Sequence, residues 1–534
     1  MHPITHAATR PDHAAIIDAA SGTTVTYGEL EARANRLARW LRAQGVTRGT
    51  SVGLLLENRP LYLEILWATQ RIGAMLVPVS TRLTAPEIAY ILGDAECSLV
   101  LTSSAFADVT AQLAAIAPGL ETVDVDSAAF RDGVNKHSPE MVEDPAPGQY
   151  MLYSSGTTGR PKGIKPAPPP SEDITAPNPL VGLATMGVGM PADGSMVYLS
   201  PAPLYHAAPL GWCSTAHRLG GTVVIMDKFT PEGALAAIER YGVTDSQWVP
   251  THFVRMLRLP EEERARYDLS THQRAIHAAA PCPVPIKEAM IEWWGPIIQE
   301  YYAGSEGIGM SLVKSEEWLA KPGTVGRMIY GKAHVCGPDG TELPPGETGL
   351  LFFENEVLPS YHKDPDKTAD AMNRQGWMTL GDIGHIDEKG RIVITDRKKD
   401  MIVNDKGDNV APQKVEGMLT LQPEIGQAMV AGDRRPYIVG LIVPDAEWAL
   451  DWCKAQGKPL DCAEAQQLPE FRAAIRKAVD RVNSELSVVE KVRGFAFADE
   501  PFSIENEEMT PSMKIRRHKI RERYGDRLDG LYRG

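Results

Sequence analysis

Apolar residues in the first part of the chain recur with the spacing of a one-sided helix. The residues Leu30, Ala34, Leu37, Ala38 and Leu41 occupy positions i, i+4, i+7, i+8 and i+11, which share one face of a helix. The segment opens with Thr26 and, three residues later, Glu29, which is the pattern of a capping box. The spacing therefore predicts a helix that begins just after Thr26 and buries one face.

Short continuous apolar runs follow this helix and alternate with further helical segments. Residues 51–56 and 74–79 predict buried strands, and residues 62–73 predict a helix between them. A strand, a helix and a second strand at this spacing favour a parallel sheet with both faces covered. The expected fold class is therefore α/β.

The pattern changes at two places further along the chain. The proline-rich residues 165–170 exclude a helix interior, because proline lacks the N–H donor, and they predict a surface loop. Short strands separated by turns begin near residue 346, and 349–354 and 391–395 are the clearest of them.

A smaller α/β segment follows Asp396. It contains an apolar strand over 437–443 and a helical stretch over 469–490. We therefore expect two domains, residues 1–395 and residues 396–534.

Composition and charge narrow the class of protein. Apolar residues make up 43% and charged residues 23% of the 534 residues, which are ordinary globular values. A net charge of −14 disfavours a nucleic-acid partner. The six cysteines form no CxxC pair, which suits a reducing cytoplasm rather than a zinc ribbon. No run of 18 apolar residues and no apolar leader occur, so we expect no integral membrane association and a cytoplasmic location.

The most informative segment is a loop rich in serine, threonine and glycine, Tyr153-Ser-Ser-Gly-Thr-Thr-Gly-Arg-Pro-Lys-Gly. Its glycines allow backbone N–H groups to converge on an anion, and its hydroxyls and Lys162 add donors and positive charge. It is not a Walker A loop, because Pro161 precedes the lysine and Gly163 follows it. A flexible turn is the alternative. The predicted phosphate-binding residues are Ser154, Ser155, Gly156, Thr157, Thr158, Gly159 and Lys162.

This loop resembles the signature of the AMP-forming adenylate enzymes, which include acyl-CoA synthetases, adenylation domains of peptide synthetases and firefly-type luciferases. Other core motifs of that superfamily occur in the same order: Ala279-Ala-Pro281, Tyr302-Ala-Gly-Ser-Glu306, Gly376-Trp-Met-Thr-Leu-Gly-Asp382, Asp396-Arg-Lys-Lys-Asp400 and Thr510-Pro-Ser-Met-Lys514. The resemblance covers essentially the whole chain. It implies a large N-terminal domain of parallel-rich sheets with a β-barrel-like subdomain, and a small mobile α+β C-terminal domain that turns about Asp396.

The resemblance also implies roles for individual residues. Tyr302 would stack on adenine, Asp382 and Arg397 would hold the ribose, and Glu306, with Thr158, would bind Mg²⁺. The nucleotide and CoA contacts implied outside the loop are Ala279, Ala280, Pro281, Tyr301, Tyr302, Ala303, Gly304, Ser305, Asp382, Arg397, Lys406, Gly407 and Lys514. Lys406 and Gly407 would lie against CoA, in a loop one residue longer than the commonest form. Ala303 and Met513 stand where glycine is more usual.

Four residues are the expected catalytic groups: Lys514, Glu306, His206 and Lys162. The acid would be bound by His206, Val249, His252 and Ala280; a packed core histidine is the alternative for His206. The implied reaction converts a fatty or aryl acid and ATP to acyl-AMP and pyrophosphate, and then transfers the acyl group to CoA. Its cofactors are ATP, Mg²⁺ and CoA. We also consider a homodimer.

Two alternatives stay open at this point. An acyl-AMP ligase would pass the acyl group to a carrier protein or another acceptor. A hydrolase is the second, because Ala303-Gly-Ser305-Glu-Gly307 is one methyl group away from a GxSxG nucleophile elbow. Asp382 and His385 follow it in the order that a catalytic triad of that kind requires.

Overall fold

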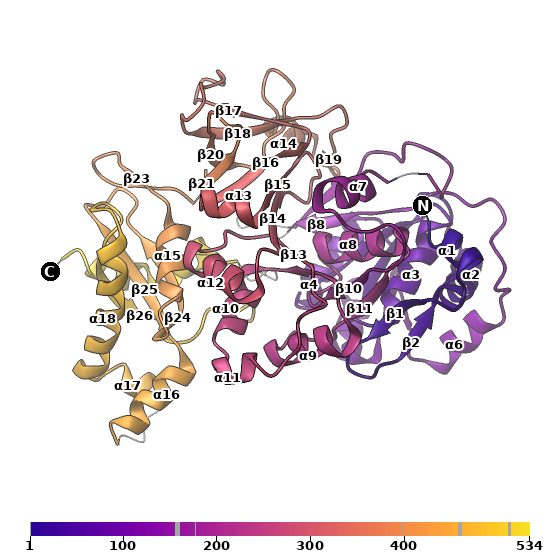
Figure 1. Ribbon diagram of the computed structural model, residues 1–534, viewed down its shortest axis with the longest axis horizontal. Coiled ribbons are helices and arrows are strands. Elements are labelled where there is room, and N and C mark those ends of the chain that lie inside the picture. The colour runs from indigo at the N-terminus through magenta and orange to yellow at the C-terminus, as the bar shows by residue number, and fades with distance from the viewer. Residues whose placement is uncertain are drawn as a thin grey trace.

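The computed structural model places the C-terminal part of the chain, drawn in orange and yellow, beside helices α10 (Pro250–Leu257) and α12 (Val284–Trp294) of the larger N-terminal part (Figure 1). The structure describes residues 2–154, 161–176, 178–398, 400–457, 462–510 and 514–533. In this part of the chain no helix is both long enough and apolar enough to cross a membrane.

Five strands of the N-terminal part, β3 to β7, form a sheet in which every pairing is parallel. Its strands, in spatial order, are β6 (Glu121–Asp124), β5 (Leu99–Thr102), β3 (Ser51–Leu55), β4 (Met75–Pro78) and β7 (Gln149–Tyr150). Helices α2 (Tyr27–Ala43), α3 (Pro60–Gln70) and α4 (Ala85–Asp94) belong to the same region. The two predicted strands and the helix between them are confirmed to within a few residues.

The predicted start of α2 is also confirmed. Glu29 N–H donates to Thr26 Oγ1 at 3.2 Å, and Thr26 N–H donates to Glu29 Oε2 at 2.9 Å. This reciprocal pair satisfies two backbone donors that the first turn of a helix leaves open.

A second sheet of 13 strands runs through the middle of the molecule. One half is built largely from parallel pairs and includes β10 (Val197–Ser200), β12 (Asp245–Trp248), β13 (Arg274–His277) and β14 (Ile298–Ala303). From β14 onward the pairings are antiparallel. Those strands are β15 (Met310–Lys314), β16 (Thr324–Tyr330), β21 (Ile392–Arg397), β20 (Asp382–Ile386), β18 (Gly349–Glu354) and β17 (Lys332–Cys336).

The mixed α/β class is therefore confirmed. The resemblance implied a β-barrel-like subdomain. In the structure its place is taken by the antiparallel strands from β15 to β17, which continue the main sheet. Because β14 is shared by both halves, it joins the parallel region to the antiparallel one.

The C-terminal part has its own three-stranded sheet and its own apolar cores. The strands are β24 (Ile425–Ala431), β25 (Ile438–Pro444) and β26 (Val492–Phe497), and the main helices are α15 (Pro412–Thr420), α18 (Pro469–Glu485) and α19 (Arg517–Gly530). The helical stretch expected to reach residue 490 ends at Glu485, because Leu486 has an extended backbone.

A buried ion pair joins α12 to β14. Lys287 of α12 (Val284–Trp294) donates to Glu300 of β14 at 2.6 Å, and its ammonium lies 4.7 Å from the centre of the Trp318 ring. Both charged side chains are buried, and burial lowers the pKa of Lys287 and raises that of Glu300. Removing one partner alone would leave an uncompensated charge in the core.

We predict that Lys287→Met lowers the free energy of unfolding by about 3–5 kcal/mol, because Glu300 then stays buried without its cation. The double variant Lys287→Met/Glu300→Gln recovers part of that loss. Lys332→Met is the matched control, since Lys332 pairs with Glu354 at the surface and costs about 1 kcal/mol or less. Denaturant titration checks this, and equal losses for the two lysines would contradict it.

Candidate active site

The lysine of the glycine-rich loop lies at the base of a hairpin. Ser154 ends β8 (Leu152–Ser154), Lys162 begins β9 (Lys162–Lys165), and the two residues pair across the antiparallel ladder. The residues between them include five predicted phosphate contacts that lie outside the described residues: Ser155, Gly156, Thr157, Thr158 and Gly159. Of the predicted loop contacts, the structure thus places Ser154 and Lys162 next to each other.

Strand β19 (Ser360–Tyr361) connects this hairpin to Glu306. Tyr361 pairs with Ile164 of β9, and its hydroxyl donates to Glu306 Oε1 at 3.1 Å. Burial and the Glu306 charge raise the pKa of Tyr361, so the phenol stays a proton donor. Sequence analysis missed Tyr361, because it lies 55 residues from Glu306 and only the β9–β19 pairing brings them together.

Asp382 accepts bonds from two sides. The Tyr302 hydroxyl donates to its Oδ2 at 2.6 Å, and Arg397 Nε lies 3.1 Å from its Oδ1. Asp382 and Arg397 are direct partners in the β20–β21 ladder, which explains their proximity. Burial and the Asp382 charge raise the pKa of Tyr302. Three residues expected at one nucleotide site are therefore in contact.

Lys514 joins these residues from the far end of the chain. Its positive charge affects His206. Burial, and then the charges of Arg82 and Lys514, lower the pKa of His206 to about 4. Burial and the Arg397 guanidinium lower the pKa of Lys514 itself, while Asp382 and Glu306 act in the opposite direction. Part of the lysine surface is exposed. Arg82, which sequence analysis missed, lies in the loop before α4.

The loop that carries Lys514 is closed at its base. Met509 and Ile515 form an antiparallel bridge, and Thr510 N–H donates to the Lys514 carbonyl at 2.8 Å. Lys514 N–H donates in return to Thr510 Oγ1 at 3.0 Å. These contacts fix the lysine backbone relative to the preceding segment.

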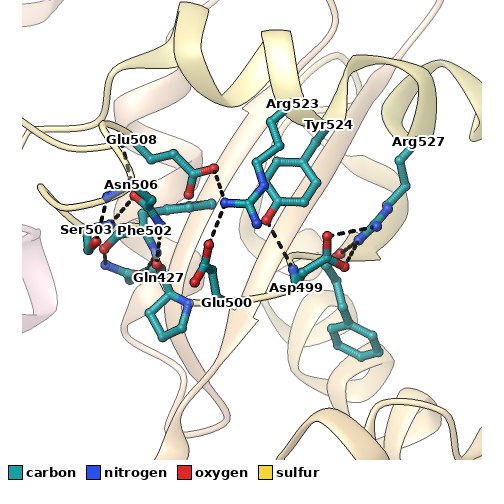
Figure 2. Close-up of polar contacts among 12 residues, drawn as sticks. Gln427, Asp499, Glu500, Phe502, Ser503, Asn506, Glu508, Arg523, Tyr524 and Arg527 are labelled. Carbon is teal, nitrogen blue, oxygen red and sulfur yellow. Dashed lines mark hydrogen bonds and ion pairs between the residues drawn. The ribbon is translucent and has the colours of Figure 1, made fainter.

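Polar contacts join α19 to residues 499–508, as Figure 2 shows. Arg523 lies 2.6 Å from Glu500 and 3.2 Å from the buried Glu508. Arg527 lies 2.8 Å from Asp499. The segments before and after Lys514 are thus joined to each other.

Tyr301 points away from the other site residues. Because successive side chains on a strand face opposite sides, Tyr301 and Tyr302 project from opposite faces of β14. Tyr301 is buried in the main core, and its hydroxyl accepts a bond from Trp212 Nε1 at 3.1 Å. The structure therefore does not place Tyr301 with Tyr302, Asp382 and Arg397, the residues with which it was predicted to contact the nucleotide.

The remaining motif residues line turns at the ends of strands. Ala279, Ala280 and Pro281 are exposed just after β13, and Ala279 has a φ of 77°. Ala303 ends β14, and Ser305 is exposed in the turn that follows. A Cβ on Gly304 would lie 2.5 Å from Leu380 Cδ2, so a larger residue here would force the Leu380 side chain to move.

Ala280 follows β13, and the other predicted acid contacts lie at helix starts. His206 precedes α8 (Ala207–Arg218) and Val249 precedes α10 (Pro250–Leu257), and neither side chain makes a capping bond. His252 is buried and stacks on Phe229 with ring centres 4.0 Å apart. Burial lowers the pKa of His252 to about 3. His252 therefore packs as a core histidine, and its contact with an acid stays a prediction.

Lys406 and Gly407 lie in an exposed turn between β22 (Ile402–Val403) and β23 (Asn409–Val410). Lys406 N–H donates to Asn404 Oδ1 at 3.0 Å, and Gly407 has a φ of 86°. Their contact with CoA stays a prediction.

The hydrolase alternative is wrong. A nucleophile elbow needs a strand, a tight turn and a helix. Ser305 instead lies between β14 and β15, two antiparallel strands of one sheet. Asp382 is engaged by Tyr302 and Arg397, so it is not a carboxylate that orients a histidine.

The donors around Glu306 fit a magnesium ion that arrives with phosphate. Among the described residues, no three His, Cys, Asp or Glu side chains gather as a metal site. Mg²⁺ is often bound by one or two carboxylates together with substrate phosphates and water. Glu306 is such a carboxylate, and Thr158 lies outside the described residues.

Comparisons with known proteins agree with this arrangement. Residues 4–361 match the model of the AMP-binding enzymes, and residues 399–534 match the AMP-binding enzyme C-terminal domain. A feruloyl-CoA synthase from Amycolatopsis sp is 31% identical over 80% of this chain and 82% of its own length. The fatty acid–[acyl-carrier-protein] ligase ScoC from Streptomyces coeruleorubidus is 30% identical over 83% of each chain.

A solved structure shows the same fold. The O-succinylbenzoate coenzyme A synthetase from Bacillus subtilis, in complex with AMP, superposes with a TM-score of 0.76 at 23% identity, covering 97% of both chains. The resemblance inferred from the motifs is confirmed: the chain belongs to the AMP-binding enzymes, the adenylate-forming superfamily that includes the acyl-CoA synthetases.

Proposed function

We propose that this chain is an AMP-forming acid–CoA ligase that activates a hydrophobic carboxylic acid. The observation that carries the proposal is the contact of Asp382 with Tyr302 and Arg397. Lys514, from a distant part of the chain, lies within electrostatic range of Asp382, Glu306 and Arg397. Such a cluster of cations and carboxylates suits a nucleotide triphosphate and the charge that develops when it reacts.

In the first step, a carboxylate oxygen of the acid attacks the α-phosphorus of ATP, the bond to the pyrophosphate oxygen breaks, and acyl-AMP forms. Lys514 stabilises the charge on the reacting oxygens, and Lys162 neutralises the leaving phosphates. Glu306 would hold Mg²⁺, which supplies further positive charge to the phosphates when bound. No protein nucleophile is needed.

Asp382 and Arg397 hold the ribose in this proposal, and Tyr302 lies under the base. The Tyr302 hydroxyl is fixed by Asp382, so its ring is oriented before the nucleotide arrives. A ring held in this way offers its face to adenine.

In the second step, the thiolate of CoA attacks the acyl carbon, and AMP leaves. We propose that residues 396–534 act as a lid that turns about Asp396 between the two steps and brings Lys406 and Gly407 toward CoA. A hinge of this kind needs a φ/ψ change at a few residues only.

The acid is of the fatty or aryl class. The feruloyl-CoA synthase and ScoC, by their names, act on an aryl-propenoic acid and on fatty acids respectively. Both are apolar molecules with one carboxylate. His206 is kept neutral by burial and by nearby cations, so it can flank the carboxylate as a hydrogen-bond donor.

A carrier-protein arm is the second candidate acceptor in place of CoA. The similarity to ScoC favours it, because that relative is named for transfer to an acyl carrier protein. The adenylation step is the same for both acceptors.

A panel of fatty and aryl acids, scored for AMP formation with and without CoA, tests the proposal. We expect acid-dependent AMP release that CoA accelerates. Release accelerated by a loaded carrier protein and not by CoA would support the second candidate. No acid-dependent release from any acid would contradict both.

The surroundings of Asp396, the proposed hinge residue, disfavour its ionised form. Asp396 is buried, and one of its oxygens accepts Arg397 N–H at 2.6 Å. Burial, with the charges of Asp400 and Glu416, raises the pKa of Asp396 to about 6, against the opposing effect of Arg517. Near neutral pH the Asp396 carboxyl is therefore ionised in the folded protein, and this ionisation lowers the free energy of unfolding.

We predict that Lys514→Ala slows acid-dependent pyrophosphate release by about 10²–10³-fold, because the reacting oxygens lose their cation. Thioester formation from supplied acyl-AMP is retained. Lys519→Ala is the control, since Lys519 pairs with Glu507 and Glu522 on the surface of α19. Rapid-quench assays of each step check this, and equal loss of both steps would count against the role of Lys514.

We predict that Asp396→Asn raises the free energy of unfolding at pH 8 by about 3 kcal/mol at most, the equivalent of the shift from 3.8 to about 6. Below pH 6 the wild-type folded state gains a proton that the unfolded state does not yet bind, so the advantage shrinks as pH falls toward 4. Asparagine Oδ1 still accepts Arg397 N–H. Denaturant titrations at several pH values check this; a pH-independent difference would contradict it.

A further inference from the structure

Arg517 follows Lys514 by three residues and begins α19. Its guanidinium forms a two-pronged contact with Glu416 of α15, with Nη1 2.6 Å from Oε1 and Nη2 2.5 Å from Oε2. Paired contacts of this kind between Arg and a carboxylate fix orientation as well as distance. The position of the residue just after the lysine loop is therefore set by α15.

Glu416 is itself held in place. It is buried, and Val430 N–H of β24 donates to its Oε1 at 2.7 Å. Arg517 Nη1 also lies 3.3 Å from the Val430 carbonyl. The lysine loop is thus fastened to a helix and a strand of the C-terminal body.

The other edge of the guanidinium faces the hinge. Arg517 Nε lies 3.8 Å from Asp400 Oδ1. The second oxygen of Asp396, Oδ2, is buried and has no hydrogen-bond partner among the described residues. Asp400 and Glu416 repel an ionised Asp396, and Arg517 is the cation whose charge opposes them.

We propose that Arg517 is a positioning residue for the adenylation step, one that sets the place of Lys514 and the orientation of the hinge together. Its fork to Glu416 fixes the loop, and its charge stabilises Asp396 and Asp400 at the turning point. The proposal rests on the ligase activity proposed above. Without Arg517, three carboxylates would face one another at the hinge, and the lid would leave the orientation that delivers Lys514.

The arginines further along α19 provide the comparison. Figure 2 shows that Arg523 and Arg527 contact Glu500, Glu508 and Asp499, all from the segment before the lysine loop. Arg527 and its partner are both partly exposed, and such pairs contribute little. Arg527→Gln therefore removes a charge from the same helix without touching the hinge carboxylates.

The experiment measures the two half-reactions separately in the full-length enzyme. We expect Arg517→Gln to slow acid-dependent pyrophosphate release by about tenfold or more, and thioester formation from supplied acyl-AMP by about threefold or less. Arg527→Gln leaves both steps within about twofold of wild type. Arg517→Lys keeps the charge and loses the fork, and it recovers part of the first step.

A suppressor variant separates the charge effect from loss of packing. If Arg517 acts by holding an ionised Asp396, Asp396→Asn removes the need for it. We expect the double variant Arg517→Gln/Asp396→Asn to adenylate faster than Arg517→Gln and more slowly than Asp396→Asn alone, because the charge effect is removed while the fork to Glu416 is still lost. The defect of Arg517→Gln also shrinks as pH falls from 8 to 6, because Asp396 then takes up a proton.

Three results would overturn the inference: adenylation by Arg517→Gln at the rate of Arg527→Gln, equal loss of both half-reactions with no suppression by Asp396→Asn, or an Arg517→Lys variant as slow as Arg517→Gln. If Arg517→Gln fails to fold, the Arg517→Lys and double variants carry the same comparison. Absence of acyl-AMP formation by the wild-type enzyme contradicts the proposed function instead, so the two failures are told apart.

Discussion

The ammonium group of Lys514, which comes from the C-terminal part of the chain, lies within electrostatic range of the carboxylates of Asp382 and Glu306. A lysine alone near the end of a chain is normally solvated. Here its pKa is set by groups from three separate segments, and burial and Arg397 favour loss of its proton while the two carboxylates favour its charge. Positive and negative groups thus act on Lys514 in opposite directions, and a phosphate bound nearby would favour its charged form. The rest of the structure serves to bring these groups together.

The sheet accounts for most of that convergence. Tyr302 leaves β14 where the parallel half meets the antiparallel half, and Asp382 and Arg397 lie side by side on β20 and β21. The β8–β9 hairpin supplies Lys162, and the short strand β19 connects the hairpin to Glu306 through Tyr361. Lys514 comes from the C-terminal part of the chain, where Arg517 joins the segment after it to Glu416.

Much of this was accessible from sequence, because the signals were local. Thr26 and Glu29 predicted the start of a helix, and apolar runs predicted β3 and β4, since each depends on neighbours within a few residues. The motif residues Asp382 and Lys514 were identified by resemblance to a family. The structure adds the observation that these motif residues act on one another.

What sequence reasoning missed depends on pairing between distant strands. Tyr361 has no local signal, and its bond to Glu306 follows from the register of β9 and β19. Tyr301 was grouped with Tyr302 because they are adjacent, but strand alternation sends it into the core beside Trp212. Arg82 and Arg517 act through charge on residues far away in the chain, which no spacing along the sequence reveals.

Protection of Lys514 by nucleotide tests the central claim most directly. The wild-type enzyme is treated with a limiting amount of an amine-acylating reagent, with and without Mg·ATP, and modification of Lys514 and Lys519 is quantified by mass spectrometry. The account predicts that Mg·ATP shields Lys514 and leaves the modification of Lys519 unchanged, because only Lys514 lies within electrostatic range of Asp382 and Glu306. Equal modification of Lys514 in the presence and absence of Mg·ATP would contradict it.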